Sequence, residues 1–133
     1  MLFIFYIYAL VDPLTKEIMY VGCTIDPWQR FIGHYSEQPK PAKPTKHNRP
    51  GLAKWKWLME HFDAGRLVEF KVLESGRWSP EQAQERERFH LNKHTPPFNR
   101  VLGSSYGISS HSNRRAIVYA LTDPATFYER IVR

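Results

Sequence analysis

Residues 3–22 read FIFYIYALVDPLTKEIMYVG, and this stretch decides the fold. Residues 3–10 and 17–22 are rich in β-branched and aromatic side chains, whereas residues 11–16 between them contain an Asp-Pro pair and are turn-like. Two such runs joined by a short loop predict an antiparallel hairpin at the start of the chain. Because an isolated hairpin is only marginally stable in water, the rest of the chain must supply elements that pack on it.

Helices and strands beyond the hairpin are marked by caps, prolines and periodicity. Ser79-Pro80-Glu81-Gln82 combines an N-cap, a first-turn proline and a glutamine three residues on, which predicts a helix start. Thr24 or Asp26 can cap an earlier helix that begins at Pro27 and carries His34. The helix that starts at Ser79 is expected over residues 79–94. Apolar residues at helical spacing or in strand alternation mark the other elements. These are helices over 52–65 and 125–132 and strands over 68–72 and 116–121.

Two segments show no such pattern. Residues 36–51 are rich in proline and lysine, and residues 103–113 are rich in glycine and serine, so both are expected to be loops. The sequence therefore predicts an α/β protein of the α+β type, with a three-stranded antiparallel sheet flanked by helices. A linker and a C-terminal strand–helix extension follow over residues 103–133. This extension either enlarges a basic surface or adds residues 117–121 as a strand to the sheet or to another copy.

Length and composition limit the class of protein. The 133 residues suffice for one compact domain, and 42% hydrophobic with 24% charged residues is typical of a chain that folds by itself. A single cysteine excludes an internal disulfide, which favours an intracellular, cytoplasmic setting. The longest apolar run, residues 1–11, is too short to cross a bilayer. The net charge of +6, with a pI near 9.6, favours an anionic partner such as nucleic acid.

Several polar residues stand where a core would take apolar ones. Tyr8 and Tyr20 lie on the two hairpin strands, and Arg30 lies in the helix that follows. Glu87 lies on an otherwise apolar stripe of the 79–94 helix, and Asn99 follows it by twelve residues. Their order and spacing resemble the GIY-YIG nuclease superfamily, and within it the nuclease domain of the bacterial excision-repair incision protein. The resemblance is carried by Tyr6-Ile7-Tyr8, Tyr20-Val21-Gly22, Asp26-Pro27, Arg30, Glu87 and Phe98-Asn99.

The resemblance implies a metal-dependent endonuclease that hydrolyses phosphodiester bonds in DNA at one active site with one Mg²⁺ or Mn²⁺ ion. It assigns residues 1–102 to the nuclease domain, with the basic loop 36–51 as an insertion longer than in minimal members. Tyr6 stands where the family name has glycine, at a position that varies in the family. The implied partner is double-stranded or branched DNA, bound by a monomer or a homodimer, in the nucleoid if the host is a bacterium.

The implied site residues differ in role. Glu87 binds the metal ion, because one carboxylate completed by waters and phosphate oxygens suits octahedral Mg²⁺. Arg30 holds a phosphate oxygen with a charge that it keeps at neutral pH. Tyr8 is the candidate general base, a role that requires a nearby cation, or else it positions the water. Tyr20 is the neighbour that orients the network around Tyr8. His34, one helical turn past Arg30, is a proton relay or a second phosphate contact.

Three further residues next to these have expected roles of their own. Asn99 is expected to tie the end of the Glu87 helix to the sheet through its amide rather than to take part in the chemistry. Gly22, which has no Cβ, lets a backbone or a phosphate come close. Cys23 has no paired base and is expected to be a bystander.

The 79–94 helix leaves two alternatives open. Glu85 also precedes Asn99, but it points about 200° away from Glu87 around the helix, which favours Glu87. His90 and His94 could bind zinc together with Glu87, although no cysteine or further histidine at ligand spacing completes a tetrahedral site.

The stretch 38–57 carries six basic residues and no acidic one. A solvated lysine face is the ordinary explanation, but tryptophans and prolines between the lysines favour contact with the DNA backbone. Two rival functions stay open: a catalytically inactive nucleic-acid-binding module on the same fold, and a protein-interaction module that uses the basic loop. The expected backbone contacts are Lys40, Lys43, Lys46, Arg49, Lys54 and Lys56, with Gly22 among the nucleic-acid-binding residues.

Overall fold

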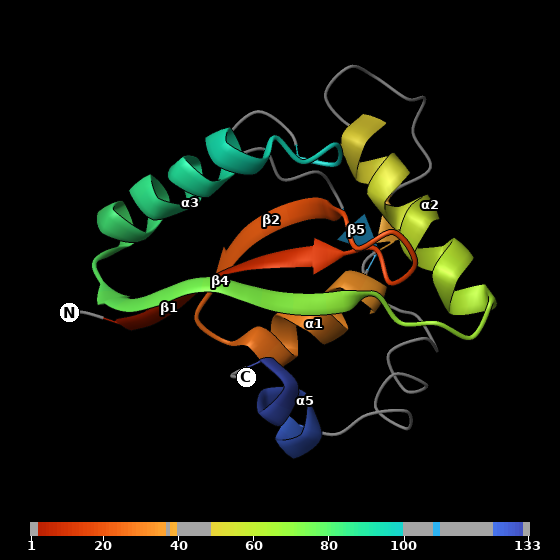
Figure 1. The fold of residues 1–133 in the computed structure, drawn as a ribbon, viewed down its shortest axis with the longest axis horizontal. Helices are drawn as coiled ribbons and strands as arrows, with labels where there is room; N and C mark the ends of the chain where they lie inside the picture. The colour runs from red at the N-terminus through yellow and green to blue at the C-terminus, as the bar shows by residue number, and fades with distance from the viewer. Residues whose placement is uncertain (1–2, 37, 40–48, 100–107, 110–123, 132–133) are drawn as a thin grey trace.

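The computed structural model describes residues 3–36, 38–39, 49–99, 108–109 and 124–131, which are drawn as helices, strands and loops in Figure 1. Among these residues, no helix is both long enough and apolar enough to cross a membrane. In chain order the elements are β1 (Phe3–Val11), β2 (Ile18–Thr24), α1 (Pro27–Ser36), β3 (Gln38–Pro39), α2 (Arg49–Asp63), β4 (Glu69–Trp78), α3 (Pro80–His94), β5 (Ile108–Ser109) and α5 (Pro124–Ile131).

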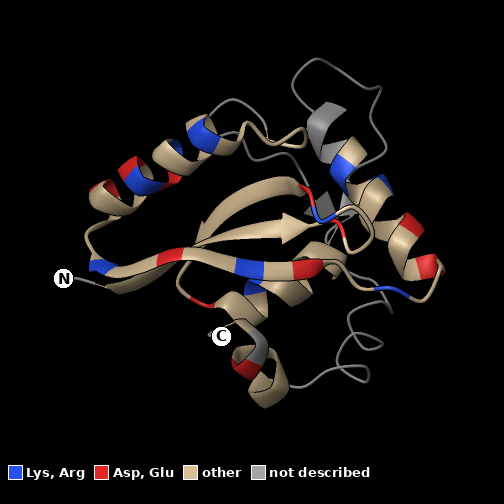
Figure 2. Cartoon of the chain, viewed as in Figure 1, with Lys and Arg blue, Asp and Glu red and all other residues tan. Residues whose placement is uncertain are grey.

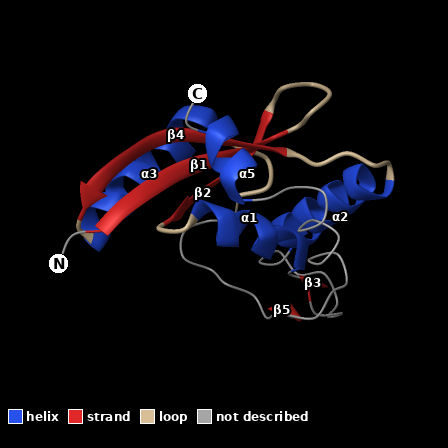
Figure 3. Cartoon of the chain, turned by 90° about the horizontal axis from the view of Figure 1, so that it is seen from below, coloured by secondary structure: helices blue, strands red, loops and turns tan. Residues whose placement is uncertain are grey.

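Strand β1 lies in the centre of the sheet, and its second half, residues 7–11, is buried on both faces. The strands pair antiparallel in the order β2-β1-β4, which confirms the predicted three-stranded antiparallel sheet. Side chains alternate along a strand, so Ile7, Ala9 and Val11 enter a small core on the α3 side. Tyr8 and Leu10 enter a larger core with α1, α2 and α5. Figures 1 and 3 show the resulting layers, with α3 on one face of the sheet and α1 and α5 on the other.

Strand β4 is longer than the sequence predicted. The expected strand covered residues 68–72, but β4 continues to Trp78. Its second half reads LESGRW, where charged residues and a glycine break the apolar alternation. This half is a strand because the first half of β1 pairs with it, with Phe3 opposite Trp78 and Ile7 opposite Glu74. A register shift between Ile7 and Tyr8 marks a bulge between the two halves.

Both expected loops contain secondary structure. β3, within residues 36–51, pairs antiparallel with β5, within residues 103–113. α2 begins at Arg49, three residues earlier than predicted, because Pro50 fits the first turn of a helix, where its missing N–H costs nothing. The expected strand at 116–121 lies outside the described residues.

The helices that carry the expected site residues begin where their caps predict. The Asp26 carboxylate accepts a hydrogen bond from Gln29 N at 3.2 Å, so Asp26 caps α1. Ser79 and Gln82 form both hydrogen bonds of a capping box at the start of α3. α3 ends at His94, and its C-cap, Thr95, has a left-handed backbone conformation with φ of 43°. These local signals therefore place α1 and α3 along the chain.

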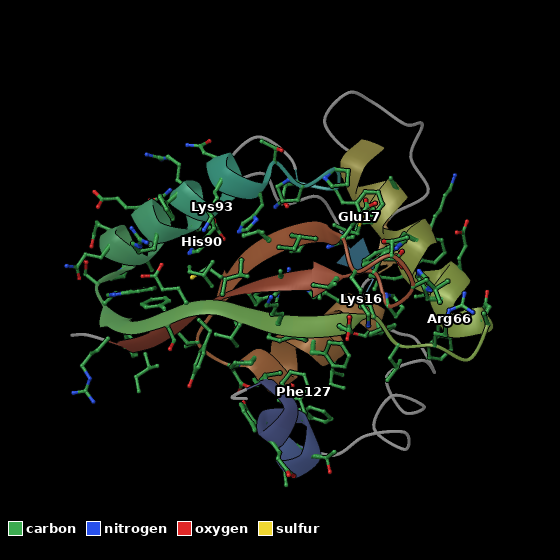
Figure 4. All side chains as sticks on the ribbon, in the orientation of Figure 1. Lys16, Glu17, Arg66, His90, Lys93 and Phe127 are labelled. Atoms are coloured by element: carbon green, nitrogen blue, oxygen red, sulfur yellow. The ribbon has the colours of Figure 1, made fainter. Side chains whose placement is uncertain are left out.

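The C-terminal helix α5 belongs to the main core. Phe127 is only 5% exposed, and its ring centroid lies 5.4 Å from that of Trp28, 5.2 Å from Phe31 and 5.2 Å from Phe70. Figure 4 shows Phe127 between α5 and α1. Tyr128 Oη also accepts a hydrogen bond from Trp28 N at 3.4 Å. The helix of the extension therefore supports α1 and is part of the same folding unit.

We expect Phe127→Ala to lower the free energy of unfolding by about 3–5 kcal/mol, because it opens a cavity between three aromatic rings. Phe127→Leu keeps more of the volume and should lose clearly less. Urea denaturation followed by tryptophan fluorescence measures both. If Phe127→Ala were as stable as the wild-type protein, α5 would not pack on this core.

A buried carboxylate fixes the turn between β1 and β2 to α2. Asp12 Oδ1 accepts hydrogen bonds from Leu14 N at 2.8 Å and Thr15 N at 3.0 Å. Asp12 Oδ2 lies 2.9 Å from Trp57 Nε1 and 3.1 Å from His61 Nε2. Burial alone would raise the pKa of Asp12, but these hydrogen bonds outweigh it and hold the pKa far below its usual range. Asp12 thereby stabilises the hairpin turn as an anion.

Asp12→Ala should lower the free energy of unfolding at pH 7 by about 3 kcal/mol, because several buried donors lose their acceptor. Since the folded-state pKa of Asp12 is depressed, this contribution is complete above the unfolded-state pKa near 4 and is lost as the pH falls below it. The gap between wild type and variant should therefore shrink in urea denaturation at pH 3. Asp63→Ala, at an exposed position at the end of α2, is the matched control. Equal losses in both variants would contradict a special role of Asp12.

Candidate active site

Tyr8 lies across Gly22 where the two hairpin strands pair. The two residues are opposite each other in the β1–β2 register, and Tyr20 is opposite Leu10. A Cβ on Gly22 would lie 2.5 Å from Tyr8 Oη and within 2.8 Å of two carbons of its ring. The missing side chain thus makes room for the Tyr8 phenol. The sequence predicted an approach of backbone or phosphate at Gly22, and the structure places Tyr8 in that space.

Two residues of α1 hold the Tyr8 hydroxyl. His34 Nε2 lies 2.7 Å from Tyr8 Oη, and Arg30 Nε donates to the same oxygen at 3.2 Å. The Tyr8 ring stacks on Phe70, with centroids 4.5 Å apart and planes inclined by 12°. The phenol is therefore fixed both at its ring and at its oxygen.

Tyr8 is fully buried, whereas Arg30 and Glu87 are half-buried. Of these three side chains, Arg30 and Glu87 are therefore the ones that solvent reaches. Both roles expected for Tyr8, as general base or as the group that positions the water, require contact with water, whereas the buried hydroxyl contacts His34 and Arg30. Tyr20 packs beside Tyr8 with ring centroids 6.2 Å apart, as expected for a neighbour that orients it.

Glu87 approaches the site from the opposite layer. It lies on α3, and burial raises its pKa, while the positive charge of Arg30 partly offsets this increase. Burial, followed by the charge of Glu87, also raises the pKa of Cys23 to about 11. Glu87 is therefore within electrostatic reach of α1 and of the edge strand β2. Glu85 is exposed, which agrees with the choice of Glu87.

Asn99 closes the free edge of β2. Its Oδ1 accepts a hydrogen bond from Val21 N at 2.8 Å, and its Nδ2 donates to Val21 O at 2.7 Å. The amide thus takes the place of a neighbouring strand. This geometry confirms the expectation that Asn99 ties the end of the Glu87 helix to the sheet, and it makes Asn99 a positioning residue.

Lys54 lies inside the site and not on the expected basic surface. It is 6% exposed, and its Nζ is 3.2 Å from His34 Nδ1 and 4.5 Å from the centroid of the Tyr20 ring. Its expected role as an external phosphate contact is therefore wrong, because the ammonium faces the protein interior. Lys56, on the next stretch of α2, is exposed as predicted. Lys40, Lys43, Lys46 and the side chain of Arg49 lie outside the described residues.

The remaining candidate groups near the site have other partners. The raised pKa of Cys23 keeps its thiol protonated at neutral pH, which agrees with a bystander. His90 Nε2 lies 3.0 Å from Glu74 Oε1, and Figure 4 shows His90 on the side of α3 that faces the sheet. Within the described part of the chain, no three His, Cys, Asp or Glu side chains form a group that could hold a metal ion. The zinc alternative therefore has no ligand set there.

The site residues fit a hard divalent cation held by one protein ligand. Glu87 is a half-buried carboxylate, and no hydrogen bond or ion pair to it is found among the described residues. A carboxylate in that position loses solvation and gains from a cation beside it. Mg²⁺ and Mn²⁺ keep several waters and need few protein ligands. Glu87 is the described residue that would hold such an ion.

Comparison of the chain with protein-family models, with curated proteins and with solved structures finds no match.

Two site residues were missed or misplaced by the sequence analysis. Phe70, which stacks on Tyr8, lies in the strand predicted over residues 68–72, but no role in the site was expected of it. Lys54 was assigned to the surface, although it precedes the buried Leu58 by four residues and His61 by seven. That spacing places Lys54 on the inward stripe of α2. The spacing was therefore the signal that could have located the Lys54 side chain.

Gly22→Ala should destabilise the protein by about 1–3 kcal/mol, because the new methyl group displaces a phenol that Phe70 prevents from moving away. In a Tyr8→Leu background the same substitution should cost little, since no ring crosses position 22. Urea denaturation of the four proteins gives the coupling between the two positions. An equal loss in both backgrounds would refute the close approach of Tyr8 to Gly22.

Proposed function

We propose that this chain is a metal-dependent endonuclease that hydrolyses phosphodiester bonds in DNA through a single GIY-YIG-type active site. The observation that carries the proposal is the convergence at the β2 edge of residues that are far apart in the sequence. They come from both helical layers and from the hairpin, in the arrangement that a phosphoryl-transfer site needs. The converging residues are Tyr8, Tyr20, Arg30, His34, Lys54, Glu87 and Asn99.

The charges of this cluster suit a phosphodiester. Arg30 and Lys54 contribute two cations, and Glu87 contributes one carboxylate. An anionic phosphate would balance the remaining positive charge, and a half-buried setting strengthens this attraction relative to bulk water. Arg30 offers a planar donor fork that matches phosphoryl oxygens, and Tyr8 holds that fork before the substrate arrives. Such preorganised donors stabilise charge that develops in the transition state.

Glu87 would hold the metal ion. When bound, a divalent ion polarises the phosphoryl oxygen and lowers the pKa of a coordinated water. The chain's own residues then orient the phosphate. Arg30 binds the phosphate, and Tyr8, itself held by His34, fixes Arg30. Asn99 holds the strand that carries Tyr20.

The net positive charge that attracts DNA lies outside the described side chains. Those side chains include ten Lys and Arg against eleven Asp and Glu, of the nineteen and thirteen in the whole chain. The described part therefore has a formal charge of −1, and the rest of the sequence carries +7. Figure 2 shows both signs mixed along α2, α3 and β4. We therefore assign most of the DNA affinity to Lys and Arg of residues 37–52 and 100–133.

The wild-type protein should nick plasmid DNA in Mg²⁺ or Mn²⁺, and Glu87→Gln and Arg30→Ala should each lower the rate by about 100-fold or more. Glu85→Gln is the matched control, because it makes the same change at an exposed position of α3. Gel assays on linear, nicked, flap and junction DNA measure cleavage and show which substrate is preferred.

Binding assays on the same substrates distinguish the alternative functions. A catalytically inactive nucleic-acid-binding module would bind DNA in a strongly salt-dependent way and leave it intact with every metal. A protein-interaction module would show neither cleavage nor specific DNA binding. If nicking persisted unchanged in both Glu87→Gln and Arg30→Ala, the proposed site would not be the one that cleaves DNA.

A further inference from the structure

Lys54 differs from the other lysines of the basic stretch in that its charge is buried. It is 6% exposed, and its Nζ contacts the His34 ring and the face of the Tyr20 ring. A buried ammonium group is unfavourable unless other groups compensate it. Lys56, two residues further along α2, is exposed. Lys54 therefore lies within the site, where its charge acts on His34 and Tyr20.

The contact between Lys54 and His34 determines where the imidazole proton lies. An ammonium group has only donors, so His34 Nδ1 is the acceptor in the 3.2 Å contact. Burial, together with the charges of Lys54 and Arg30, lowers the pKa of His34 well below its usual value. The ring is therefore neutral and carries one proton. With Nδ1 occupied as an acceptor, that proton is on Nε2.

The proton on Nε2 determines what Tyr8 receives. His34 Nε2 lies 2.7 Å from Tyr8 Oη, so Nε2–H donates to this oxygen, as Arg30 Nε–H does from 3.2 Å. Two donors on one phenol oxygen polarise that oxygen. The polarisation strengthens the hydrogen bond that it accepts from Arg30. If His34 were protonated on Nδ1 instead, Nε2 would accept a hydrogen bond from the Tyr8 hydroxyl. Tyr8 Oη would then hold Arg30 less strongly.

We propose that Lys54 is a positioning residue whose ammonium group selects the Nε2–H tautomer of His34. It thereby directs the chain of hydrogen bonds from Lys54 through His34 to the Tyr8 oxygen that holds Arg30. The effect of Lys54 on catalysis rests on the proposed function. The tautomer of His34 does not, because it is a property of the folded protein.

Nitrogen-15 NMR of the full-length, ¹⁵N-labelled protein measures the tautomer directly, because protonated and unprotonated imidazole nitrogens differ widely in chemical shift. We expect His34 in the wild type to show a protonated Nε2 and an unprotonated Nδ1 between pH 6.5 and 8, with His34→Gln assigning the signals. Lys54→Arg, which keeps the charge and the donors, should preserve this state. Lys54→Met should populate the Nδ1–H form.

A wild-type His34 protonated on Nδ1 would overturn the proposal, and so would an unchanged tautomer in Lys54→Met. If Lys54→Met does not fold, the wild-type spectrum and Lys54→Arg still decide the question. These outcomes do not depend on whether the protein cleaves DNA, so failure of this inference is distinguishable from failure of the proposed function.

For an active wild type, Lys54→Met should lower kcat by about tenfold at an unchanged Kd for DNA, and Lys54→Arg should restore part of the loss. The reason is that Lys54 acts through His34 and Tyr8 and does not contact the substrate. Lys56→Met provides the contrast, because an exposed phosphate contact acts on Kd. A loss of DNA affinity in Lys54→Met equal to that in Lys56→Met would show that Lys54 serves as an external contact and would refute the proposal.

Discussion

The close approach of the Tyr8 phenol to Gly22 is the constraint on which the site depends. Because position 22 has no side chain, the hydroxyl of Tyr8 reaches past β2 to the residues of α1. This geometry requires Tyr8 to be opposite Gly22 in the register of the hairpin. A shift of that register by one residue would turn Tyr8 to the α3 face of the sheet. The hydrogen bonds of Asp12, which fix the turn to α2, therefore also protect the site.

The site is assembled from several elements, and each element has its own support. α1 carries Arg30 and His34 and rests on Phe127 of α5. α2 carries Lys54 and is joined to the hairpin turn through Asp12. Asn99 pairs with the free edge of β2. In a poorly solvated cluster, hydrogen bonds are strong but misplaced polar groups are costly, so these supports determine whether the cluster forms.

Local signals in the sequence were sufficient for much of the fold. The hairpin, the cap of α1 and the capping box of α3 follow from neighbouring residues, and the structure confirms them. The second half of β4 could not be predicted in this way, because only its pairing with β1 makes it a strand. α5 shows the same limit, since nothing near Phe127 in the sequence indicates which residues it packs against.

The candidate site was predictable as a set of residues but not as a geometry. Tyr8, Arg30, Glu87 and Asn99 were selected because of a resemblance, and that resemblance says nothing about burial. The structure shows Tyr8 fully buried and Lys54 turned inward, two facts that depend on how α1 and α2 pack on the sheet. A charged residue at an inward position of an amphipathic helix is usually taken to be exposed, because burial of a charge is costly. Here the ammonium group of Lys54 contacts the His34 and Tyr20 rings inside the fold.

Under the proposed function, the distribution of charge along this small chain separates affinity for DNA from chemistry. The described side chains are close to neutral in total, but they include the half-buried Arg30 and the buried Lys54. The excess positive charge lies in residues 37–52 and 100–133, and the β3–β5 pair joins a point in each of these segments. Exposed charges are screened by salt, whereas half-buried ones are screened much less. Under the proposed function, salt should therefore weaken binding of DNA more than it alters the chemical step, because Arg30, which would bind the phosphate, is half-buried.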